Sequence, residues 1–294
     1  YFLRERDLMT LYLLQIFNGI GVGMLYFLMA VGLSIIFGLL RFVNFAHGAF
    51  FMIGAYLAYA VVVSMGLDFW VSLIVVPIVV FVFAIVLERV LLRRAYRLSH
   101  MAQILLTFGL SMILQELAIV IWGTDALHMP TPQALSGVAE FGPFIYPKYR
   151  LFVIAFTAIL AIVLWWLLEG TRLGAIVRAG SEHGDMTSLL GHDIPKIFML
   201  VFGLGVALAA LAGVLAAPIR GVEPFMGLDG LSIAFVVVVI GGMGSFSGAL
   251  VGGLLVGVLQ SLLSTIWPEM ARPVIYVCMA MVLLMRPYGL FGRG

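Results

Sequence analysis

Two polar side chains stand close together within a strongly apolar part of the chain. Asn44 and His47 belong to the run Phe-Val-Asn-Phe-Ala-His-Gly at positions 42–48, which directly follows Arg41. A carboxamide, an imidazole and a glycine this close in sequence are able to hydrogen-bond a solute or the backbone of an opened helix, and polar residues at membrane depth are functional candidates. The alternative is that Arg41 marks the membrane edge and Asn44 caps the next helix, since Asn is a favoured N-cap residue.

The second candidate region is the glycine-rich run Gly-Gly-Met-Gly-Ser at positions 241–245. It follows an apolar stretch, residues 231–240, that is too short to cross a bilayer alone, and its glycines favour a broken or re-entrant helix. Transporters commonly bind solutes where repeat-related helices break near the membrane midplane. We therefore expect Gly242 and Ser245, together with Asn44 and His47, to lie near a translocation path.

A weak internal repeat supports this pairing of two regions. The run Gly-Leu-Ser-Ile-Ile-Phe at 32–37 precedes His-Gly-Ala at 47–49, and Gly-Leu-Ser-Ile-Ala-Phe at 230–235 precedes Ser-Gly-Ala at 247–249. Transporter folds commonly arise from duplicated halves, although chance recurrence in apolar sequence is the alternative. Another glycine series has the spacing that lets helices pack closely: Gly248, Gly252, Gly253 and Gly257.

Patterns typical of enzymes are missing from the sequence. The two His–acid neighbours lack a further metal ligand at helical spacing: Glu182-His183 and His192-Asp193. The acids of the apolar segments are scattered: Glu88, Glu116 and Glu169. The chain also has no Gly-x-x-x-x-Gly-Lys-Ser/Thr loop for ATP. We predict a protein that is not an enzyme and needs no cofactor or metal, so that any ATP hydrolysis takes place in a partner.

The composition defines the elements that position these residues. Of the 294 residues, 64% are hydrophobic and 10% are charged, whereas about a quarter of residues are charged in soluble domains. Because each crossing takes roughly 20 residues, this chain has room for about eight or nine transmembrane helices and no large soluble domain. The prediction is an all-α, polytopic membrane protein forming one domain over residues 1–294, with apolar segments at 8–40, 42–67, 69–87, 101–122, 151–168, 197–219, 231–240, 249–267 and 274–285.

Basic residues predict the orientation of the helices. Lys and Arg gather at residues 89–97, 172–196 and 286–293, and loops rich in these residues are usually cytoplasmic. The loops 123–150 and 220–230 should then face outside, and so should the N-terminus if residues 8–40 cross once. With a net charge of +2 and basic residues near membrane edges, we expect membrane lipid rather than nucleic acid as the surrounding partner.

The polar segment 172–196 is an unusual insertion in so apolar a chain. Ser181 is a candidate helix start with an acidic first turn, Met186, Leu189 and Leu190 line one side at helical spacing, and Gly191 ends the pattern before Pro195. These features predict a short amphipathic helix parallel to the membrane, which is able to dock in a groove of a soluble ATPase and transmit its closure. An ordinary solvated loop helix is the alternative.

The motifs resemble those of the LivH-type permeases of branched-chain amino acid ABC importers, over nearly the whole chain. The resemblance rests on residues 32–38, 43–48, 53–56, 178–191, 207–215, 241–245 and 286–292. It implies a coupling helix in the loop at about 171–196, with Ser181, Glu182, Asp185, Leu189, Leu190 and Asp193 as contacts to the ATPase. Ala49 departs from the family pattern, where an acidic residue is common, and Met186 and Thr187 stand where alanines are common.

The resemblance also implies the partners, the location and the activity. The partners are ATP-binding cassette subunits, a second related permease and an extracytoplasmic substrate-binding protein, and the location is the bacterial inner membrane. The expected activity is alternating-access import of branched-chain or other hydrophobic amino acids. Relatives with similar motifs serve urea or amides, so a permease or passive channel for such solutes is the alternative, and co-purification with an ATP-binding subunit would separate the two.

Overall fold

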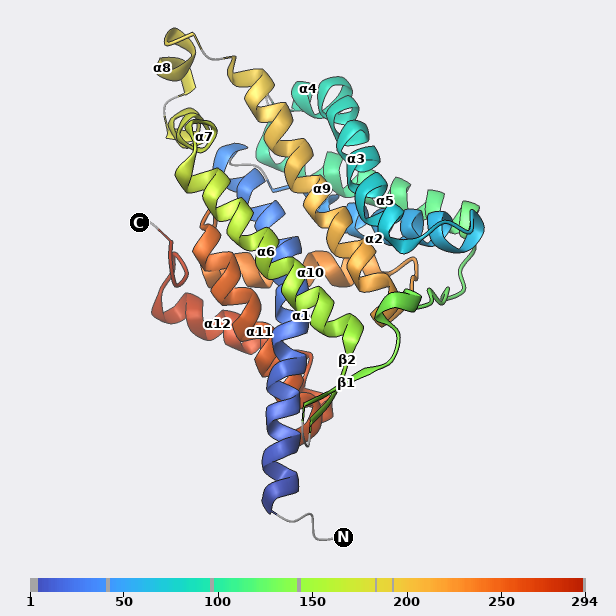
Figure 1. Cartoon of the computed structure of the whole chain (residues 1–294). Coiled ribbons are helices and arrows are strands. Elements are labelled where there is room, and N and C mark those ends of the chain that lie inside the picture. The colour runs from blue at the N-terminus through green and yellow to red at the C-terminus, as the bar shows by residue number, and fades with distance from the viewer. Residues whose placement is uncertain are drawn as a thin grey trace.

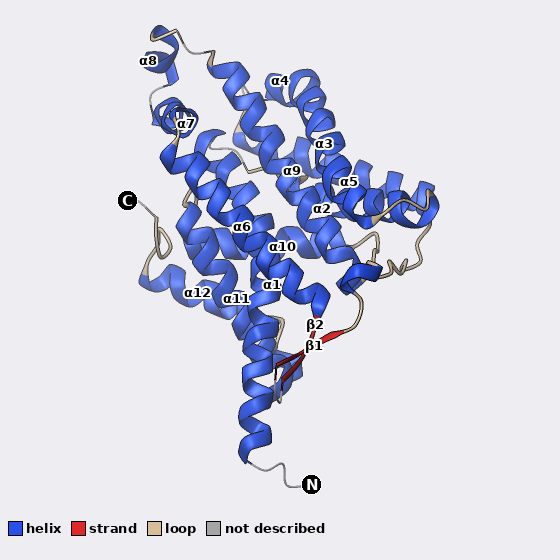
Figure 2. Ribbon diagram, viewed as in Figure 1, coloured by secondary structure: helices blue, strands red, loops and turns tan. Residues whose placement is uncertain are grey.

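The computed structural model describes residues 5–40, 43–95, 98–141, 144–182, 184–191 and 193–292, without the side chains of residues 5–9, 141, 144, 181, 182, 184 and 185. Arg41, Arg97, His183, His192 and Arg293, which figured in the sequence predictions, lie outside the described residues. Within these ranges the chain is almost entirely helical (Figures 1 and 2). The all-α prediction is confirmed, with one small β-hairpin as an addition.

Seven helices of the described part are long and apolar enough to cross a membrane, and two more are apolar but shorter. The long ones are α1 (Glu5–Leu40), α2 (His47–Tyr59, extended by a π-helix at Ala60–Ser64), α3 (Phe69–Leu87, extended through a π-helix at Glu88–Leu92 into α4, Arg93–Ala95), α5 (His100–Trp122), α6 (Lys148–Gly170), α9 (Ile194–Arg220) and α11 (Phe246–Ile266). The short ones are α10 (Met226–Gly241) and α12 (Pro273–Met285). The predicted eight or nine transmembrane helices agree roughly with these seven long and two shorter apolar helices.

The remaining elements are short. They are the 3-10 turns Gln133–Leu135 and Pro268–Met270, the polar helices α7 (Arg172–Glu182) and α8 (Gly184–Leu189), and the strands β1 (Val138–Phe141) and β2 (Phe144–Pro147). The strands pair antiparallel from Val138 opposite Pro147 to Phe141 opposite Phe144. This hairpin lies in the predicted outer loop 123–150.

Helix α1 forms the centre of the bundle and packs against α6, α9, α10 and α11. Its residues from Met24 to Leu33 are almost completely buried. Glycines allow α11 to approach it closely: a Cβ atom at Gly23 would lie 2.8 Å from the carbonyl oxygen of Gly253. The interpretation of the glycine series on α11 as a packing surface is thus confirmed at Gly253, because a larger side chain there would force the two backbones apart.

The two ends of the bundle differ in content. Helices α4, α7 and α8 gather at one end, called the α8 end below, and the N-terminus of α1 lies at the opposite end (Figure 1). The hairpin belongs to this second end, called the hairpin end, since the Tyr146 hydroxyl of β2 donates to the carbonyl oxygen of Phe17 in the N-terminal half of α1, at 3.2 Å. The regions predicted to be cytoplasmic around α4 and α7 therefore share one end, and α1 starts at the opposite end, in agreement with the predicted arrangement.

Both copies of the internal repeat contain a helix break. The first break lies between α1 and α2, and the second lies between α10 and α11, where Gly242 and Gly244 adopt φ values of 104° and 81°. Such left-handed values favour glycine. The amides of Leu290 and Phe291 donate to the last carbonyl groups of α10, at 2.9 Å each. The predicted break at 241–245 is confirmed.

Two boundary predictions are wrong. Helix α10 begins at Met226, inside the predicted loop 220–230, because Met226 is a buried apolar residue and Gly227 packs against Gly48 of α2. Helix α2 begins at His47 rather than at residue 42. In both cases the helix end follows from a contact between α2 and α10 that the sequence does not display.

Candidate functional site

The predicted pair Asn44 and His47 lies in the interior of the bundle. Both side chains are completely buried, and His47 Nε2 lies 3.0 Å from the carbonyl oxygen of Met29 in the middle of α1. The Asn44 Oδ1 accepts from the amide of Ala46 at 3.1 Å, but the N-cap position of α2 is Ala46, so the capping alternative is wrong as stated.

Each of these two residues keeps one polar group unpaired. Among the described residues, Asn44 Nδ2 and His47 Nδ1 have no hydrogen-bond partner although both are buried. An unpaired buried donor or acceptor costs about 1–3 kcal/mol. A cost of this kind is tolerated where another state of the protein pairs the group, which is consistent with a functional role for both residues.

Gly242 and Ser245 form the second helix break. Gly242 is buried at the end of α10, and Ser245 caps α11 because its Oγ accepts from the amide of Gly248 at 3.0 Å. Ser34 of α1 donates to the Ser245 carbonyl oxygen at 3.4 Å. The two predicted pairs therefore contact α1 at different levels, about a turn and a half apart by helix geometry, and no hydrogen bond joins them within the described part.

A polar cavity of about 480 Å³ at the hairpin end was not predicted from the sequence. Its charged lining residues are Arg220, Glu223, Asp229 and Arg272, which come from the end of α9, the next loop, the first half of α10 and the residue before α12. Its apolar lining residues include Phe51, Met226, Ile233 and Ile275. The one sequence feature that could have indicated this cavity is the pair of acidic residues in the loop 220–230 predicted to lie outside.

Arg220 is held in a fixed place in this cavity. Its Nη2 donates to the hydroxyl of Tyr26 at 2.7 Å, and that hydroxyl donates to Gln260 Oε1, also at 2.7 Å. The guanidinium carbon lies 5.4 Å from the centre of the Tyr26 ring, a cation–π distance. Since Tyr26 is only 3% exposed, three helices (α1, α9 and α11) orient one guanidinium group toward the cavity.

The cavity and the buried polar pair are neighbours along α2. Phe51 lines the cavity and lies one helical turn from His47. The contact of Gly48 with Gly227 closes the space between α2 and α10 at that level, and Phe51 packs against Gly230. Asn44 and His47 therefore lie about one helical turn deeper in the bundle than the cavity. The contact between α2 and α10 at Gly48 and Gly227 separates them from it.

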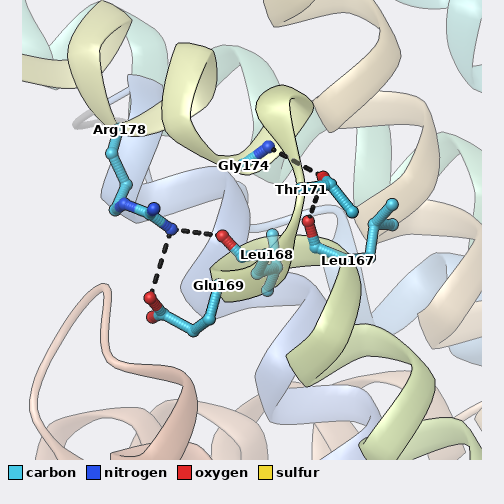
Figure 3. Close-up of polar contacts among 6 residues, drawn as sticks. All are labelled: Leu167, Leu168, Glu169, Thr171, Gly174 and Arg178. Carbon is cyan, nitrogen blue, oxygen red and sulfur yellow. Dashed lines mark hydrogen bonds and ion pairs between the residues drawn. The ribbon is translucent and has the colours of Figure 1, made fainter.

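At the α8 end, the junction between α6 and α7 is tightly bonded (Figure 3). The Thr171 hydroxyl donates to the Leu167 carbonyl oxygen at 2.6 Å and accepts from the Gly174 amide at 3.3 Å. Arg178 of α7 donates to the carbonyl oxygen of Leu168 and pairs with Glu169 at 3.3 Å. We call this junction, residues 167–178, the elbow, because these contacts fix the angle between α6 and α7.

The prediction of one helix starting at Ser181 is wrong. Ser181 lies near the end of α7, and a separate helix, α8, runs over Gly184–Leu189. The first turn of α7 is instead stabilised by Thr171, whose side chain bonds the Gly174 amide as in other Ser and Thr caps. The side chains of Ser181, Glu182 and Asp185 are outside the described part of the chain, so their predicted coupling role stays a prediction.

The predicted apolar surface of the segment is present on α8 and after it. Met186, Leu189 and Leu190 are 65%, 83% and 80% exposed. Asp193 caps α9 by accepting from the Lys196 amide at 3.2 Å, and it also pairs with the Lys196 ammonium at 2.9 Å. The hydrogen bond from Lys196 holds the pKa of the Asp193 carboxyl below its usual value. Asp193 thus has a structural role that the sequence prediction did not include.

A helical bundle with two broken helices, a polar cavity at one end and an exposed apolar helix at the other has the architecture of a membrane transport permease. The chain belongs to the family of permease components of branched-chain amino acid transport systems, whose family model matches residues 15–283. It is therefore a multi-pass permease of the cytoplasmic membrane, a transport subunit rather than an enzyme, and it works with ATPase partners supplied by other chains.

Curated relatives match over almost their full length. The chain is 33% identical over 303 residues to the high-affinity branched-chain amino acid permease BraD of Pseudomonas aeruginosa. It is 32% identical over 300 residues to LivH of Escherichia coli K12 and 31% identical over 297 residues to LivH of Salmonella typhimurium. In each case the match covers 96% of both chains. No solved structure matches the chain significantly.

Proposed function

We propose that this chain imports branched-chain or other hydrophobic amino acids by alternating access. The observation that carries the proposal is the full-length similarity to three permeases named for branched-chain amino acids. The partners in this proposal are two ATP-binding cassette subunits, a second related permease and an extracytoplasmic substrate-binding protein. Urea and amides are the less favoured solutes.

In this proposal the hairpin end faces outside, and its cavity receives the solute. The apolar lining of Phe51, Met226 and Ile233 suits an aliphatic side chain. Separation of α2 from α10 would open a route past Asn44 and His47, whose unpaired groups would then meet the solute or water. Gly242 and Ser245 form the break that lets the inner parts of α10 and α11 move apart.

The chain forms a single permease domain, and its segment at about 171–196 couples this motion to ATP hydrolysis in the partner subunits. The exposed Leu189 and Leu190 of the segment supply an apolar contact for the ATP-binding subunit, with Ser181, Glu182, Asp185 and Asp193 as polar neighbours. The elbow passes the movement of α7 to α6 because Arg178 bonds the last turn of α6. A rigid junction is needed here, since a flexible one would absorb the displacement.

The test is solute-dependent ATP hydrolysis by the complete complex in proteoliposomes with its substrate-binding protein. We expect leucine-loaded binding protein to stimulate hydrolysis and leucine uptake together, and we expect urea to do neither. Uptake that continues without ATP would support a passive channel instead. Stimulation by urea or an amide, but not by leucine, would assign the chain to the other solute class.

A further inference from the structure

The charged residues that line the cavity at the hairpin end include both signs and are not paired with one another. Arg220, Glu223, Asp229 and Arg272 all line the cavity and are exposed to it. Among the described residues, no ion pair joins any of them; the ion pairs found lie elsewhere, between Arg178 and Glu169 and between Lys196 and Asp193. Charged side chains of both signs that line one cavity without pairing with each other are available to bind a ligand.

Two of these charged groups lie at helix ends. Arg220 is the last residue of α9, where the helix dipole favours a cation. Asp229 lies in the first turn of α10, where the dipole favours an anion. Both residues line the same cavity, so the cavity presents a cation and an anion that come from two neighbouring helix ends.

The cavity also contains an apolar part between these charges. Phe51, Met226, Ile233 and Ile275 are almost completely buried and line it. With a volume of about 480 Å³, it falls within the usual range of small-molecule sites, roughly 300–1,000 Å³. A solute that satisfies all three parts carries a carboxylate, an ammonium group and an aliphatic side chain.

We infer that this cavity is a selective receiving site for the zwitterionic form of an aliphatic amino acid. Arg220 and Arg272 bind the carboxylate, Asp229 and Glu223 bind the ammonium group, and the apolar residues contact the side chain. This inference rests on the proposed function, and it adds that the permease itself discriminates solutes after their release from the binding protein. A uniformly charged or neutral analogue would leave one pair of charged residues without a partner, which is costly in a confined site.

The test is a protection experiment on the full chain assembled with its importer subunits in lipid nanodiscs. Cys278, the only cysteine in the sequence, is replaced by Ser, and Tyr276→Cys places a thiol on the exposed cavity wall. The rate of its reaction with N-ethylmaleimide is measured with leucine, with leucinamide, which lacks the carboxylate, and with 4-methylpentanoate, which lacks the ammonium group. We expect leucine to slow the reaction several-fold and each analogue to have little effect.

Charge variants then test the assignment of residues. Asp229→Asn and Arg272→Gln should each raise the leucine concentration needed for protection about tenfold, as expected for the loss of one charge-assisted hydrogen bond. Arg272→Lys should retain part of the effect. Glu269→Gln is the matched control, because Glu269 lines the neighbouring cavity and not this one.

Several outcomes would overturn the inference. They are equal protection by the analogues, protection that survives both charge variants, and variants that only weaken docking of the binding protein. Leucine-dependent ATP hydrolysis without protection by leucine would reject this site and leave the proposed function standing. Protection without such hydrolysis would reject the proposed function and leave the site.

Discussion

The elbow at the α8 end and the cavity at the hairpin end use charged residues in opposite ways. At the elbow, Arg178 is bonded to a backbone carbonyl group and a carboxylate of α6, so its charge serves the protein's own rigidity. In the cavity, Arg220 uses one donor to fix its position and leaves the others available. At one end the charged group is used within the protein, and at the other it faces a cavity.

The two ends also differ in their apolar surfaces. The apolar residues of the cavity are buried in its walls, whereas Leu189 and Leu190 of the α8 end are more than three-quarters exposed. Apolar side chains that project from a polar segment outside the spans mark a contact with another protein. In the functions proposed above, the cavity receives a small solute and the exposed leucines contact another protein.

Leu190→Asp should have the largest effect, and this effect should come from the α8 end alone. We expect more than about a tenfold loss of ATPase-subunit binding and of transport, because a charge replaces an apolar anchor of the contact. The matched control is Ile145→Asp, an exposed apolar position on the hairpin, which should retain subunit binding. Binding is measured by co-purification in detergent, and unchanged transport by the Leu190 variant would contradict the docking role of residues 186–190.

Tyr26→Phe should weaken the cavity without affecting the elbow. The change removes the hydroxyl that binds Arg220 and Gln260, and the loss of such a hydrogen bond corresponds to about 1–2 kcal/mol, or a factor of about 5 to 30 in an equilibrium constant. We expect a higher solute requirement for stimulated ATP hydrolysis with an unchanged ratio of transport to hydrolysis. A fall in that ratio would show that Tyr26 belongs to the coupling machinery instead.

Arg178→Met should produce the opposite pattern. It removes the hydrogen bond from α7 to the Leu168 carbonyl oxygen as well as the ion pair. We therefore expect ATP hydrolysis that depends less on solute. The free energy of unfolding should fall by about 1 kcal/mol. Glu169→Gln removes only the ion pair, whose side chains are 45% and 54% exposed, and should cost less than about 0.5 kcal/mol. Equal effects of the two variants would mean that the backbone contact is unimportant.

Asp193 should show a small effect confined to the start of α9. Asp193→Ala loses the cap and should lower the melting temperature slightly, whereas Asp193→Asn retains a capping oxygen and should recover most of it. Because the pKa of this carboxyl is lowered in the folded protein, its contribution is present above the usual carboxyl pKa and disappears as the pH falls through the lowered value. A melting temperature of the Ala variant that equals the wild type at neutral pH would contradict the capping role.

Some of the fold follows from local sequence alone. The apolar segments predict the helices because each crossing satisfies its own backbone hydrogen bonds, and the glycines at 241–245 predict the second break because Gly242 and Gly244 need left-handed dihedral angles. The predicted helix start at Ser181 is wrong because it was inferred from the local residues alone. Helix α7 begins at Arg172, next to Thr171 and the end of α6, and runs through Ser181, and the local pattern near Ser181 does not show this earlier start.

The sequence by itself determined the membrane class, the positions of the long helices, both breaks and the family. Only the tertiary structure decided that Tyr26, Arg220 and Gln260 meet in one hydrogen-bonded chain at the wall of a cavity. Tyr26 and Arg220 are 194 positions apart in the sequence, so no local pattern connects them. Hydrophobicity and helix-breaking glycines act over a few residues, whereas a binding site is made by helices that approach one another only when the whole bundle packs.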